Sequence, residues 1–485
     1  MNPQIAETID KSLPSEFWKQ GCVSNWYLKP KQALALDFIS QTSSPFFEAS
    51  RRYGKTTTVL AYVLEQSIKT SGLITRWCEP WKNQCREIVM PEMDQIQAKI
   101  PIEERFRWQQ TDSVYIHPNA SKIYLRGVNE DRAESARGPK SDIIVADEIG
   151  SWREPTYVLN EVLRPQLLTT NGKLICTGTP PRNLAHVFYD MKDRAIQEKR
   201  FIQRLIHEQE LVSWEQVEKY VLEMGGWDSS AVRRELLCEK VIDKNFAIIP
   251  EWDDRFVQDV SRDAFFQFYG KYDSLDIGVR DNTVCLFAYY DFKRAALIIL
   301  DEVVLSGPEM TTERLAEEAR AKETEHFGIA WERTQIEAKV RWKAVMPPNT
   351  RMRRVSDIDL RMVNDMSQLH GLYFEPTDKG YLEEMVNEVR VWVGNGRVLV
   401  NPRCKNLIEC LKCGIWDEDR KQWERSERLG HFDALASLMY MIRNVDRQTN
   451  PIPMEFGKSE DEYFFSAPKS KEKKKDALKK IFNVR

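Results

Sequence analysis

Short apolar runs alternate with segments of helical spacing in the first part of the chain. The apolar runs lie at residues 45–50, 73–79, 142–148 and 173–179, and their nearly continuous apolar character predicts buried strands. Between them, residues 56–69 and 155–168 repeat their apolar positions at the spacing of a helix. This alternation is typical of an α/β domain whose mainly parallel sheet is covered on both faces.

The pattern changes after residue 183. Residues 184–245 are mostly charged with helical spacing, which predicts a lid or subdomain, and 246–265 reads as a linker. Residues 266–305 hold three strand-like runs joined by short polar turns, which predicts an antiparallel meander, and helices are expected at 311–326 and 430–445. We therefore expect a first α/β domain at 1–183, the helical subdomain, the linker, a second α/β domain at 266–447 and a flexible basic tail at 448–485.

Composition limits the class of protein. The 485 residues are 42% hydrophobic and 11% aromatic, enough for about two to three packed domains. A net charge of −3 argues against a passive DNA coat, so contact with nucleic acid requires local basic patches. Nine scattered cysteines favour a reducing compartment. The opening residues do not resemble a secretory signal and no apolar run is long enough for a bilayer, so we expect a soluble intracellular protein without membrane contact.

A phosphate-binding loop is predicted where a strand meets a helix. There, backbone N–H groups and the positive end of the helix dipole would converge on the phosphates of ATP. Lys55 would reach the β- and γ-phosphates and Thr56 would bind Mg²⁺, whereas Ala49 replaces the first glycine of the usual pattern. The alternative is an ordinary turn with solvated basic residues. The predicted nucleotide-binding residues are Ala49, Ser50, Arg51, Arg52, Tyr53, Gly54, Lys55 and Thr56.

Two later strands end in residues suited to ATP hydrolysis. Asp147 and Glu148 follow a buried apolar run, where carboxylates are costly unless they have a use. Asp147 would hold Mg²⁺ together with Thr56, and Glu148 would orient and deprotonate the attacking water. Thr177, at the end of the next strand, would contact the γ-phosphate or the attacking water and transmit hydrolysis to the rest of the protein.

Gln32 and Arg137 complete the expected ATP site. Gln32 lies upstream of the first strand and would read adenine through a paired donor and acceptor, although a surface glutamine that begins a helix is the alternative. Arg137 precedes the strand that carries the acid pair and would reach the ATP of a neighbouring subunit. Arg132, Arg51 and Arg52 are alternatives for this role, and a solvated arginine is the simplest reading.

Together these motifs resemble the large terminase subunits of tailed double-stranded DNA bacteriophages. In that family an RR-x-GKT loop, an upstream glutamine, an Arg-Gly pair, an Asp-Glu pair and a Thr-Gly-Thr motif occur in the order found between Tyr27 and Pro180. The resemblance implies a P-loop ATPase core of the RecA-like type with an additional central strand and a catalytic glutamate (ASCE), here Glu148. It also implies a C-terminal nuclease of RNase H-like α/β fold.

Such a nuclease needs carboxylates from distant parts of the chain around two divalent ions. Asp276 lies on the first strand of the meander, and Asp433 begins the last amphipathic helix, where it would also suit the helix dipole. Asp357, after a short strand-like run, is our choice for the middle acid, with Asp359 and Glu337 as rivals. These three aspartates are the predicted metal ligands and catalytic residues of the nuclease. Oxygen ligands favour Mg²⁺ or Mn²⁺ over zinc.

The resemblance implies a role in viral DNA packaging. ATP hydrolysis would drive double-stranded DNA into a procapsid, and an endonuclease would cut concatemeric DNA at initiation and termination. The implied partners are a portal protein, a small terminase subunit and further copies of the chain in a ring of about five, with a monomer in solution. The implied location is the host cytoplasm and, transiently, the procapsid portal, but not the mature virion. A helicase-like motor with a fused nuclease and a non-catalytic packaging scaffold are the alternatives.

Overall fold

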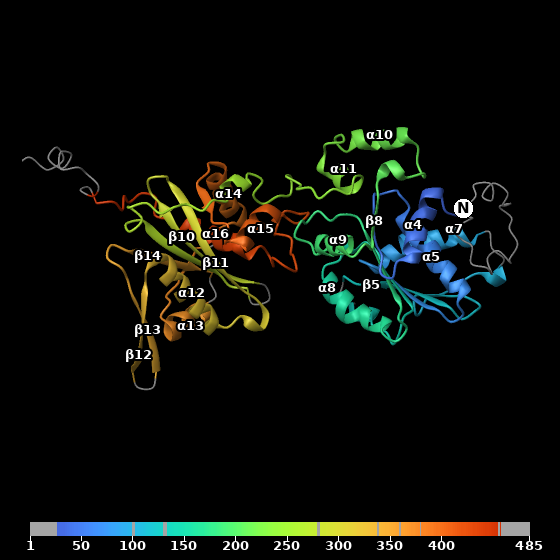
Figure 1. The fold of residues 1–485 in the computed structure, drawn as a ribbon, viewed down its shortest axis with the longest axis horizontal. Coiled ribbons are helices and arrows are strands. Elements are labelled where there is room, and N and C mark those ends of the chain that lie inside the picture. The colour runs from blue at the N-terminus through green and yellow to red at the C-terminus, as the bar shows by residue number, and fades with distance from the viewer. Residues whose placement is uncertain are drawn as a thin grey trace, which may run out of the picture. The chain divides into compact units, whose positions relative to one another are not determined.

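The computed structural model describes residues 27–98, 102–129, 133–278, 282–336, 339–357, 360–378, 380–453 and 456. They form two compact units (Figure 1). The first unit comprises Met1–Pro250 and Glu409–Phe432, and the second comprises Glu251–Ile408 and Asp433–Arg485. The polypeptide therefore returns to the first unit after it has formed most of the second.

An eight-stranded sheet forms the centre of the first unit, in the order β3-β4-β5-β2-β6-β7-β1-β8. Every pairing within the stretch β5-β2-β6-β7-β1-β8 is parallel. Strands β3 and β4 extend the β5 edge in antiparallel pairing. The strands are β1 (Phe46–Ala49), β2 (Ile74–Glu79), β3 (Arg107–Gln109), β4 (Val114–Ile116), β5 (Lys122–Gly127), β6 (Ile143–Ala146), β7 (Lys173–Gly178) and β8 (Phe201–Arg204).

Helices flank this sheet (Figure 1). The longer ones are α4 (Pro30–Gln41), α5 (Lys55–Lys69), α7 (Met90–Gln97), α9 (Phe188–Gln197), α10 (Trp214–Glu223) and α11 (Ser230–Glu235). The shorter turns are α6 (Lys82–Gln84), η1 (Cys85–Val89), η2 (Ile102–Glu104), η3 (Ala133–Ala136), η4 (Ile149–Ser151), α8 (Pro155–Tyr157), η5 (Val158–Leu163), η6 (Arg164–Leu167) and η7 (Ile206–Glu208). Across the described ranges, no helix combines the length and apolar character that a bilayer crossing needs.

Two hydrophobic cores lie on the two faces of this sheet. Along β1, Phe46 belongs to one core and Phe47 to the other, because successive side chains of a strand point to opposite faces. Along β6, Val145 and Ala146 divide in the same way. Both faces of the strands are therefore buried, and the predicted α/β class with a mainly parallel, doubly covered sheet is confirmed.

The position of β8 was not expected. Residues 184–245 were predicted to be mostly helical, yet Phe201–Arg204 forms the edge strand beside β1. The strand is short and contains Gln203 and Arg204, and three of its four residues are only partly buried. Its apolar signal is consequently too weak to distinguish it from its charged, helical surroundings.

The second unit contains a six-stranded sheet in the order β15-β14-β9-β10-β11-β16. Strands β9, β10 and β11 form the predicted antiparallel meander, and β14, β15 and β16 are added in parallel pairing. The order β11-β10-β9-β14-β15 with β10 antiparallel to the others is the arrangement of an RNase H-like sheet. The strands are β9 (Gly270–Asp276), β10 (Thr283–Asp291), β11 (Ala296–Leu305), β14 (Arg351–Ser356), β15 (Glu375–Pro376) and β16 (Val398–Val400).

Helices and a separate hairpin complete the second unit. The helices are η8 (Asp254–Phe256), η9 (Gly307–Glu309), α12 (Thr312–Phe327), α13 (Leu360–His370), α14 (Leu382–Gly394) and α16 (Asp433–Arg443), while α15 (Lys405–Cys413) contains the boundary between the two units. The hairpin of β12 (Ala330–Ile336) and β13 (Lys339–Val345) projects from this unit (Figure 1).

Helix α16 is buried against the meander. Every residue from Asp433 to Ile442 is buried, although the sequence predicts an amphipathic helix. The hydroxyl of Ser437 donates to the carbonyl of Ser274 on β9, and the hydroxyl of Ser274 donates to the carbonyl of Ser437, both at 2.7 Å. This reciprocal pair satisfies the polar side chains of a fully buried helix and sets its position along β9.

A buried charged cluster joins α12 to the opposite face of the sheet. Arg354 on β14 donates to both oxygens of Glu323 on α12, at 2.5 and 2.8 Å. Asp273 on β9 lies directly across from Arg354 in the sheet register, 3.8 Å from its Nε. Burial, followed by the nearby charge of Glu323, raises the pKa of Asp273 well above its usual range. One arginine thus balances two carboxyl groups in a dry interior.

Replacement of Arg354 by Met should lower the free energy of unfolding of the second unit by about 3–5 kcal/mol, because it leaves Glu323 buried without its partner. Chemical denaturation followed by tryptophan fluorescence measures the loss. In the matched control Arg353→Met, the lost ion pair with Glu375 is about half exposed, so the cost should stay below about 1 kcal/mol. Equal losses in the two variants would contradict this account.

Candidate functional site

The predicted phosphate-binding loop connects β1 to α5. Arg52 has φ 69° and Gly54 has φ 87°, so the backbone is left-handed twice before the helix begins at Lys55. The positive φ of Gly54 favours glycine, and a Cβ atom there would lie 2.1 Å from Gln32 Nε2, so a larger residue would displace the Gln32 side chain. The first N–H groups of α5 lack partners within the helix, which is the arrangement that binds phosphate.

Neighbouring elements hold the first half of the loop. The N–H of Ser50 donates to the carbonyl of Arg204 at 2.8 Å, and that of Arg51 donates to the carbonyl of Glu235 at 2.9 Å. The guanidinium of Arg51 also pairs with the carboxylate of Glu235 at 2.9 Å. Arg51 and Arg52 are exposed at this surface. Strand β8 and helix α11 therefore fix the loop, although they belong to the segment that the sequence assigned to a lid.

Gln32 lies against the loop rather than on an open surface. Its Oε1 accepts from the N–H of Lys29 at 3.0 Å, and its Nε2 donates to the carbonyl of Tyr53 at 3.2 Å. The hydroxyl of Tyr53 donates to the carbonyl of Lys31 at 2.9 Å, which adds a second link between α4 and the loop. Gln32 and Tyr53 thus join the predicted adenine-reading segment to the predicted phosphate-binding segment.

Two contacts connect the start of α5 with the acid pair after β6. Lys55 Nζ lies 2.5 Å from Glu148 Oε1, and the hydroxyl of Thr56 donates to Asp147 Oδ2 at 3.2 Å. Burial alone would lower the pKa of Lys55, but the charges of Glu148 and Asp147 outweigh it and raise that pKa. The structure therefore brings these four predicted residues together at the carboxyl ends of parallel strands.

Asp147 is held by further hydrogen bonds. The hydroxyl of Thr177 and the N–H of Glu148 both donate to Asp147 Oδ1, the latter at 3.0 Å. The backbone of Glu148 is left-handed, with φ 50° and ψ 45°, and the indole of Trp152 donates to the carbonyl of Asp147 at 2.9 Å. Left-handed backbone at a glutamate is costly and is found mainly at functional sites.

Two residues that the sequence analysis did not select lie in the same site. The hydroxyl of Thr179, not that of Thr177, lies 3.4 Å from Lys55 Nζ, and it donates to the carbonyl of Ala49 at 3.3 Å. Glu79, the last residue of β2, is fully buried beside Asp147. Burial and then the charge of Asp147 raise the pKa of Glu79 well above its usual range. A carboxylate at the end of an apolar strand was the available signal for Glu79.

Arg137 lies away from the acid pair in its own unit. Its guanidinium donates twice to Glu134, at 2.7 and 2.9 Å, and once to the carbonyl of Glu161 at 3.1 Å. The side chain is half exposed, and none of these contacts involves Lys55 or Glu148. The structure therefore does not bring Arg137 to the other residues of the expected ATP site within one chain.

The second unit brings the three predicted nuclease acids to one end of its sheet. Asp276 ends β9, and the N–H of Asp357, directly after β14, donates to the carbonyl of Leu275 at 3.1 Å. Asp433 begins α16, and its Oδ2 accepts from the N–H of Asn282 at 3.1 Å. Two carboxylates thus follow neighbouring parallel strands, while the third starts the helix that packs on them.

Tyr440 on α16 lies close to these acids, and the sequence analysis did not select it. Burial raises the pKa of Tyr440, and the charges of Asp276, Asp357 and Asp433, together with a hydrogen bond to Asp276, raise it further. Its hydroxyl therefore lies within electrostatic reach of all three carboxylates. Asp433 and Tyr440 are seven residues apart on α16, about two helical turns, which is the signal that could have identified it.

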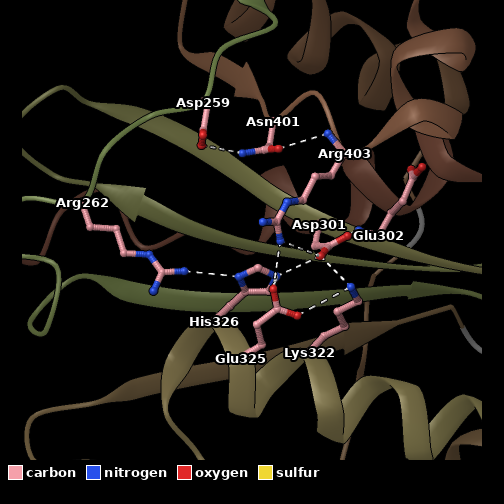
Figure 2. A network of polar contacts seen from close by, with 9 residues as sticks. All are labelled: Asp259, Arg262, Asp301, Glu302, Lys322, Glu325, His326, Asn401 and Arg403. Atoms are coloured by element: carbon pink, nitrogen blue, oxygen red, sulfur yellow. Dashed lines mark hydrogen bonds and ion pairs between the residues drawn. The ribbon is translucent and has the colours of Figure 1, made fainter.

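A separate network of charges lies on α12 and β11 (Figure 2). Asp301 Oδ2 accepts from Lys322 Nζ at 2.7 Å and lies 3.0 Å from His326 Nε2. Arg262 lies 3.2 Å from His326 Nδ1. Because a guanidinium only donates, Nδ1 accepts, and Nε2 carries the proton that His326 donates to Asp301. Arg403 pairs with Glu325 at 2.9 Å.

This network has ligand types that suit a metal ion, since atoms of Asp301, Glu325 and His326 lie within 4.8 Å of one another. Three cationic side chains already occupy them: Lys322 neutralises Asp301, Arg403 pairs with Glu325, and Arg262 engages His326. A divalent ion would have to displace these partners. We therefore interpret the network in Figure 2 as a structural bridge between α12, β11 and the segment before α15.

Several sequence predictions cannot be placed. Arg132, Glu337 and Asp359, the alternatives for the arginine and for the middle acid, lie outside the described residues. The same holds for most of the basic tail predicted at 448–485. Among the nuclease candidates that the structure describes, Asp357 is therefore the one whose position can be compared with Asp276 and Asp433.

Part of the chain is similar to one family of proteins. Residues 46–247 match the model described as terminase large subunit, T4likevirus-type, N-terminal. The large terminase of a thermophilic bacteriophage is 16% identical with a TM-score of 0.38, covering 86% of this chain and 98% of that chain. The HK97 bacteriophage large terminase is 14% identical with a TM-score of 0.49, covering 86% of this chain and 94% of that chain. The P22 large terminase nuclease domain is 12% identical with a TM-score of 0.29, covering 41% of this chain and 92% of that chain. No curated protein matches the chain.

The charge network in Figure 2 predicts a pH-dependent contribution to stability. Burial would raise the pKa of Asp301, but hydrogen bonds from His326 and Lys322 lower it from 3.8 to about 2. Asp301→Asn should therefore lower the free energy of unfolding by about 2 kcal/mol at pH 7. Because the folded pKa is depressed, the stabilisation is complete above pH 4 and is lost as the pH falls towards 2, with about half remaining at pH 3.

Urea denaturation of the wild type and of Asp301→Asn between pH 7 and pH 3 measures this difference. Asp259→Asn is the matched control, because Asp259 belongs to the same network but accepts from the neutral amide of Asn401 at 2.8 Å. A difference between the wild type and Asp301→Asn that stayed constant down to pH 3 would show that the interaction is not ionic.

Proposed function

We propose that this chain, whose residues 46–247 match the N-terminal model of the large terminase subunits, is the ATP-driven motor and DNA-cutting subunit of a phage packaging machine. In this proposal the first unit hydrolyses ATP to move double-stranded DNA into a procapsid. The second unit cuts concatemeric DNA when packaging begins and when it ends. The observation that carries the proposal is the meeting of the phosphate-binding loop with the acid pair, in a chain that also has an RNase H-like sheet with converging acids.

Strand order supports the ATPase assignment. The loop follows β1 and the acid pair follows β6, while β7 lies between these two strands. This extra central strand is the feature expected from the family resemblance. It separates the end of β1 from the end of β6 by two strand spacings, about 10 Å. The side chains of Lys55 and Glu148 nevertheless meet at 2.5 Å, and Lys55 Nζ also lies 3.4 Å from the hydroxyl of Thr179, just after β7.

The proposed roles in ATP hydrolysis follow from these positions. Lys55 would bind the β- and γ-phosphates and would then no longer be paired with Glu148. The carboxylate of Glu148 could then accept a proton from the attacking water. Ala49, Ser50, Arg51, Arg52, Tyr53 and Gly54 would form the loop around the phosphates. The first N–H groups of α5 would donate to the phosphates, because the N–H groups of Ser50 and Arg51 already donate to neighbouring carbonyls. Thr177 would hold Asp147 in place. Gln32 would contact the adenine after a local change in its hydrogen bonds, because its amide is bonded to backbone here.

The residues present fit Mg²⁺ in the ATP site. Thr56 and Asp147 offer oxygen atoms 3.2 Å apart at the start of α5 and the end of β6, and Mg²⁺ prefers such ligands together with phosphate oxygens. Mg²⁺ bound there would neutralise charge on the phosphates. Arg137, half exposed, would act on the ATP of a neighbouring subunit in an assembled ring.

The proposed nuclease centre consists of Asp276, Asp357 and Asp433, which come from three separate elements. Their oxygens suit two Mg²⁺ or Mn²⁺ ions, which would support attack on a phosphodiester. The three acids would hold the ions, and Tyr440 would orient Asp276. The cluster of Arg354 and Glu323 on the other face of β9 and β14 would keep the two strand ends in place.

Partners and location are part of the same proposal. The proposed partners are double-stranded DNA, a portal protein on the procapsid, a small terminase subunit and a ring of about five copies. The proposed location is the host cytoplasm and, transiently, the procapsid. We also retain as proposed boundaries an ATPase core at 1–183, a lid at 184–245, a linker at 246–265, a nuclease at 266–447 and a tail at 448–485.

A helicase-like motor with a fused nuclease is less well supported. Such a motor requires a second RecA-like domain with its own parallel sheet after the first. The second unit instead centres on an antiparallel meander with three acids at one end. A non-catalytic scaffold is also less well supported, because it would have no reason to keep Lys55 and Glu148 paired in a buried site.

Lys55→Ala and Glu148→Gln should each reduce ATP turnover by at least about a thousandfold, because they remove the phosphate contact and the water-activating carboxylate. Phosphate release by the purified chain, with its packaging partners added where needed, measures this loss. Lys173→Ala is a matched control, since Lys173 lies at the start of β7 and bonds to carbonyls of α4. ATP turnover in Lys55→Ala close to wild type would rule out this site.

Asp276→Ala and Asp433→Ala should abolish the cutting of plasmid DNA in Mg²⁺ or Mn²⁺ while ATP turnover persists, because the two sites lie in different units. Gel electrophoresis and phosphate release on the same preparations measure both activities. Asp291→Ala is the control, because Asp291 ends β10 at the opposite end of the meander. Persistent cutting by both alanine variants at Asp276 and Asp433 would place the catalytic acids elsewhere.

A further inference from the structure

Glu79 occupies a defined place beside the acid pair. Strands β2 and β6 are adjacent and parallel, with Cys78 paired to Ala146, so the next residues, Glu79 and Asp147, lie side by side at the carboxyl edge. The N–H of Asp147 donates to the carbonyl of Cys78 at 2.9 Å, which continues the pairing to the end of the strand. In parallel strands, paired residues point to the same face, so the two carboxylates face the same side.

The two oxygens of Glu79 differ in their surroundings. The indole of Trp77, two residues earlier on the same face of β2, donates to Oε1 at 2.9 Å. Oε2 is buried and has no hydrogen-bond partner among the described residues. A buried carboxylate oxygen without a donor is costly, and a second carboxylate beside it increases the cost. The hydrogen bond from Trp77 therefore fixes the orientation of the Glu79 carboxylate, and Oε2 remains available to accept a hydrogen bond.

The position of β2 limits what Glu79 can contact. Strands β6 and β7 separate β2 from β1, so Glu79 lies on the side of Asp147 away from the phosphate-binding loop. Glu148 faces Lys55 and is partly exposed, whereas Glu79 is fully buried. Glu79 is thus poorly placed to reach the γ-phosphate. It is well placed to contact a ligand of Asp147 on the β2 side of that carboxylate.

We infer that Glu79 is a further acid of the ATP site, and that its Oε2 accepts a hydrogen bond from a water molecule bound to the Mg²⁺ that accompanies the nucleotide. The inference rests on the proposed function, since it concerns the same ATP site. Mg²⁺ keeps several of its waters in proteins and is bound through one or two carboxylates with phosphate oxygens. Mg²⁺ bound to Asp147 would offset the repulsion between the two carboxylates, and its bound water would supply the missing donor to Glu79 Oε2. Glu79 is then a positioning residue and Glu148 remains the base.

The test is the dependence of nucleotide binding on Mg²⁺. Glu79→Gln keeps the acceptor for Trp77 and nearly the same shape while it removes the charge. Binding of mant-ADP to the full chain is measured by fluorescence, first in EDTA and then during titration with MgCl₂. In Glu79→Gln the Mg²⁺ concentration at half-maximal effect should rise on the order of tenfold, with no change in EDTA. Displacement of Mn²⁺, followed by electron paramagnetic resonance, should show the same weakening.

Glu65→Gln is the matched control, because Glu65 is also a buried glutamate of the first unit but lies on α5 beside Lys69. It should leave the Mg²⁺ dependence unchanged. Thermal unfolding in EDTA adds a second measurement: Glu79→Gln removes repulsion from Asp147, so its melting temperature should equal or exceed that of the wild type.

Three outcomes would overturn the inference: an unchanged Mg²⁺ titration in Glu79→Gln, an equal loss of mant-ADP binding with and without Mg²⁺, or a lower melting temperature in EDTA. These outcomes are distinct from failure of the proposed function, in which the wild type itself would not bind mant-ADP at all. A wild type that binds the nucleotide with Mg²⁺, together with a selective shift in Glu79→Gln, supports both.

Discussion

The structure depends on how charged groups at the ends of buried strands find partners. Parallel strands covered on both faces place their carboxyl ends at one edge, and residues after these ends lie in a site that is largely removed from water. In the first unit, Glu148 is paired with Lys55, and Asp147 is bonded to Thr56 and Thr177. The cost of burying these charges is offset only if the loop and the strand ends keep their relative positions. Organisation of the nucleotide site and stability of the sheet therefore have the same physical cause.

The second unit uses the same rule on both faces of one sheet. Asp276 and Asp357 follow β9 and β14 at the edge where α16 contributes Asp433. Three residues earlier on the same two strands, Asp273 and Arg354 point to the other face and form the cluster with Glu323. One face thus carries charges that compensate one another, and the other carries three carboxylates at one end of the sheet. Carboxylate oxygens gathered in this way suit divalent ions.

Elements with strong local patterns were predictable. The apolar runs of β1, β2, β6 and β7, the meander of β9 to β11 and the helix beginning at Asp433 are found where the sequence indicates them. The loop from Ala49 to Thr56 was recognisable because glycine, lysine and threonine each meet a specific geometric need at adjacent positions. Strand β8 was not recognisable, because a four-residue edge strand with three partly exposed residues leaves little periodic signal.

The sequence alone determined the fold class, the phosphate-binding loop and which acids stand at strand ends, because these depend on residues close together in the chain. Only the tertiary structure decided that Glu79 lies beside Asp147, that Thr179 rather than Thr177 contacts Lys55, and that Tyr440 lies within electrostatic reach of three acids. It also decided that Arg354 on β14 is the partner of Glu323 on α12. These facts depend on strand order and register, which follow from the packing of residues far apart in the chain.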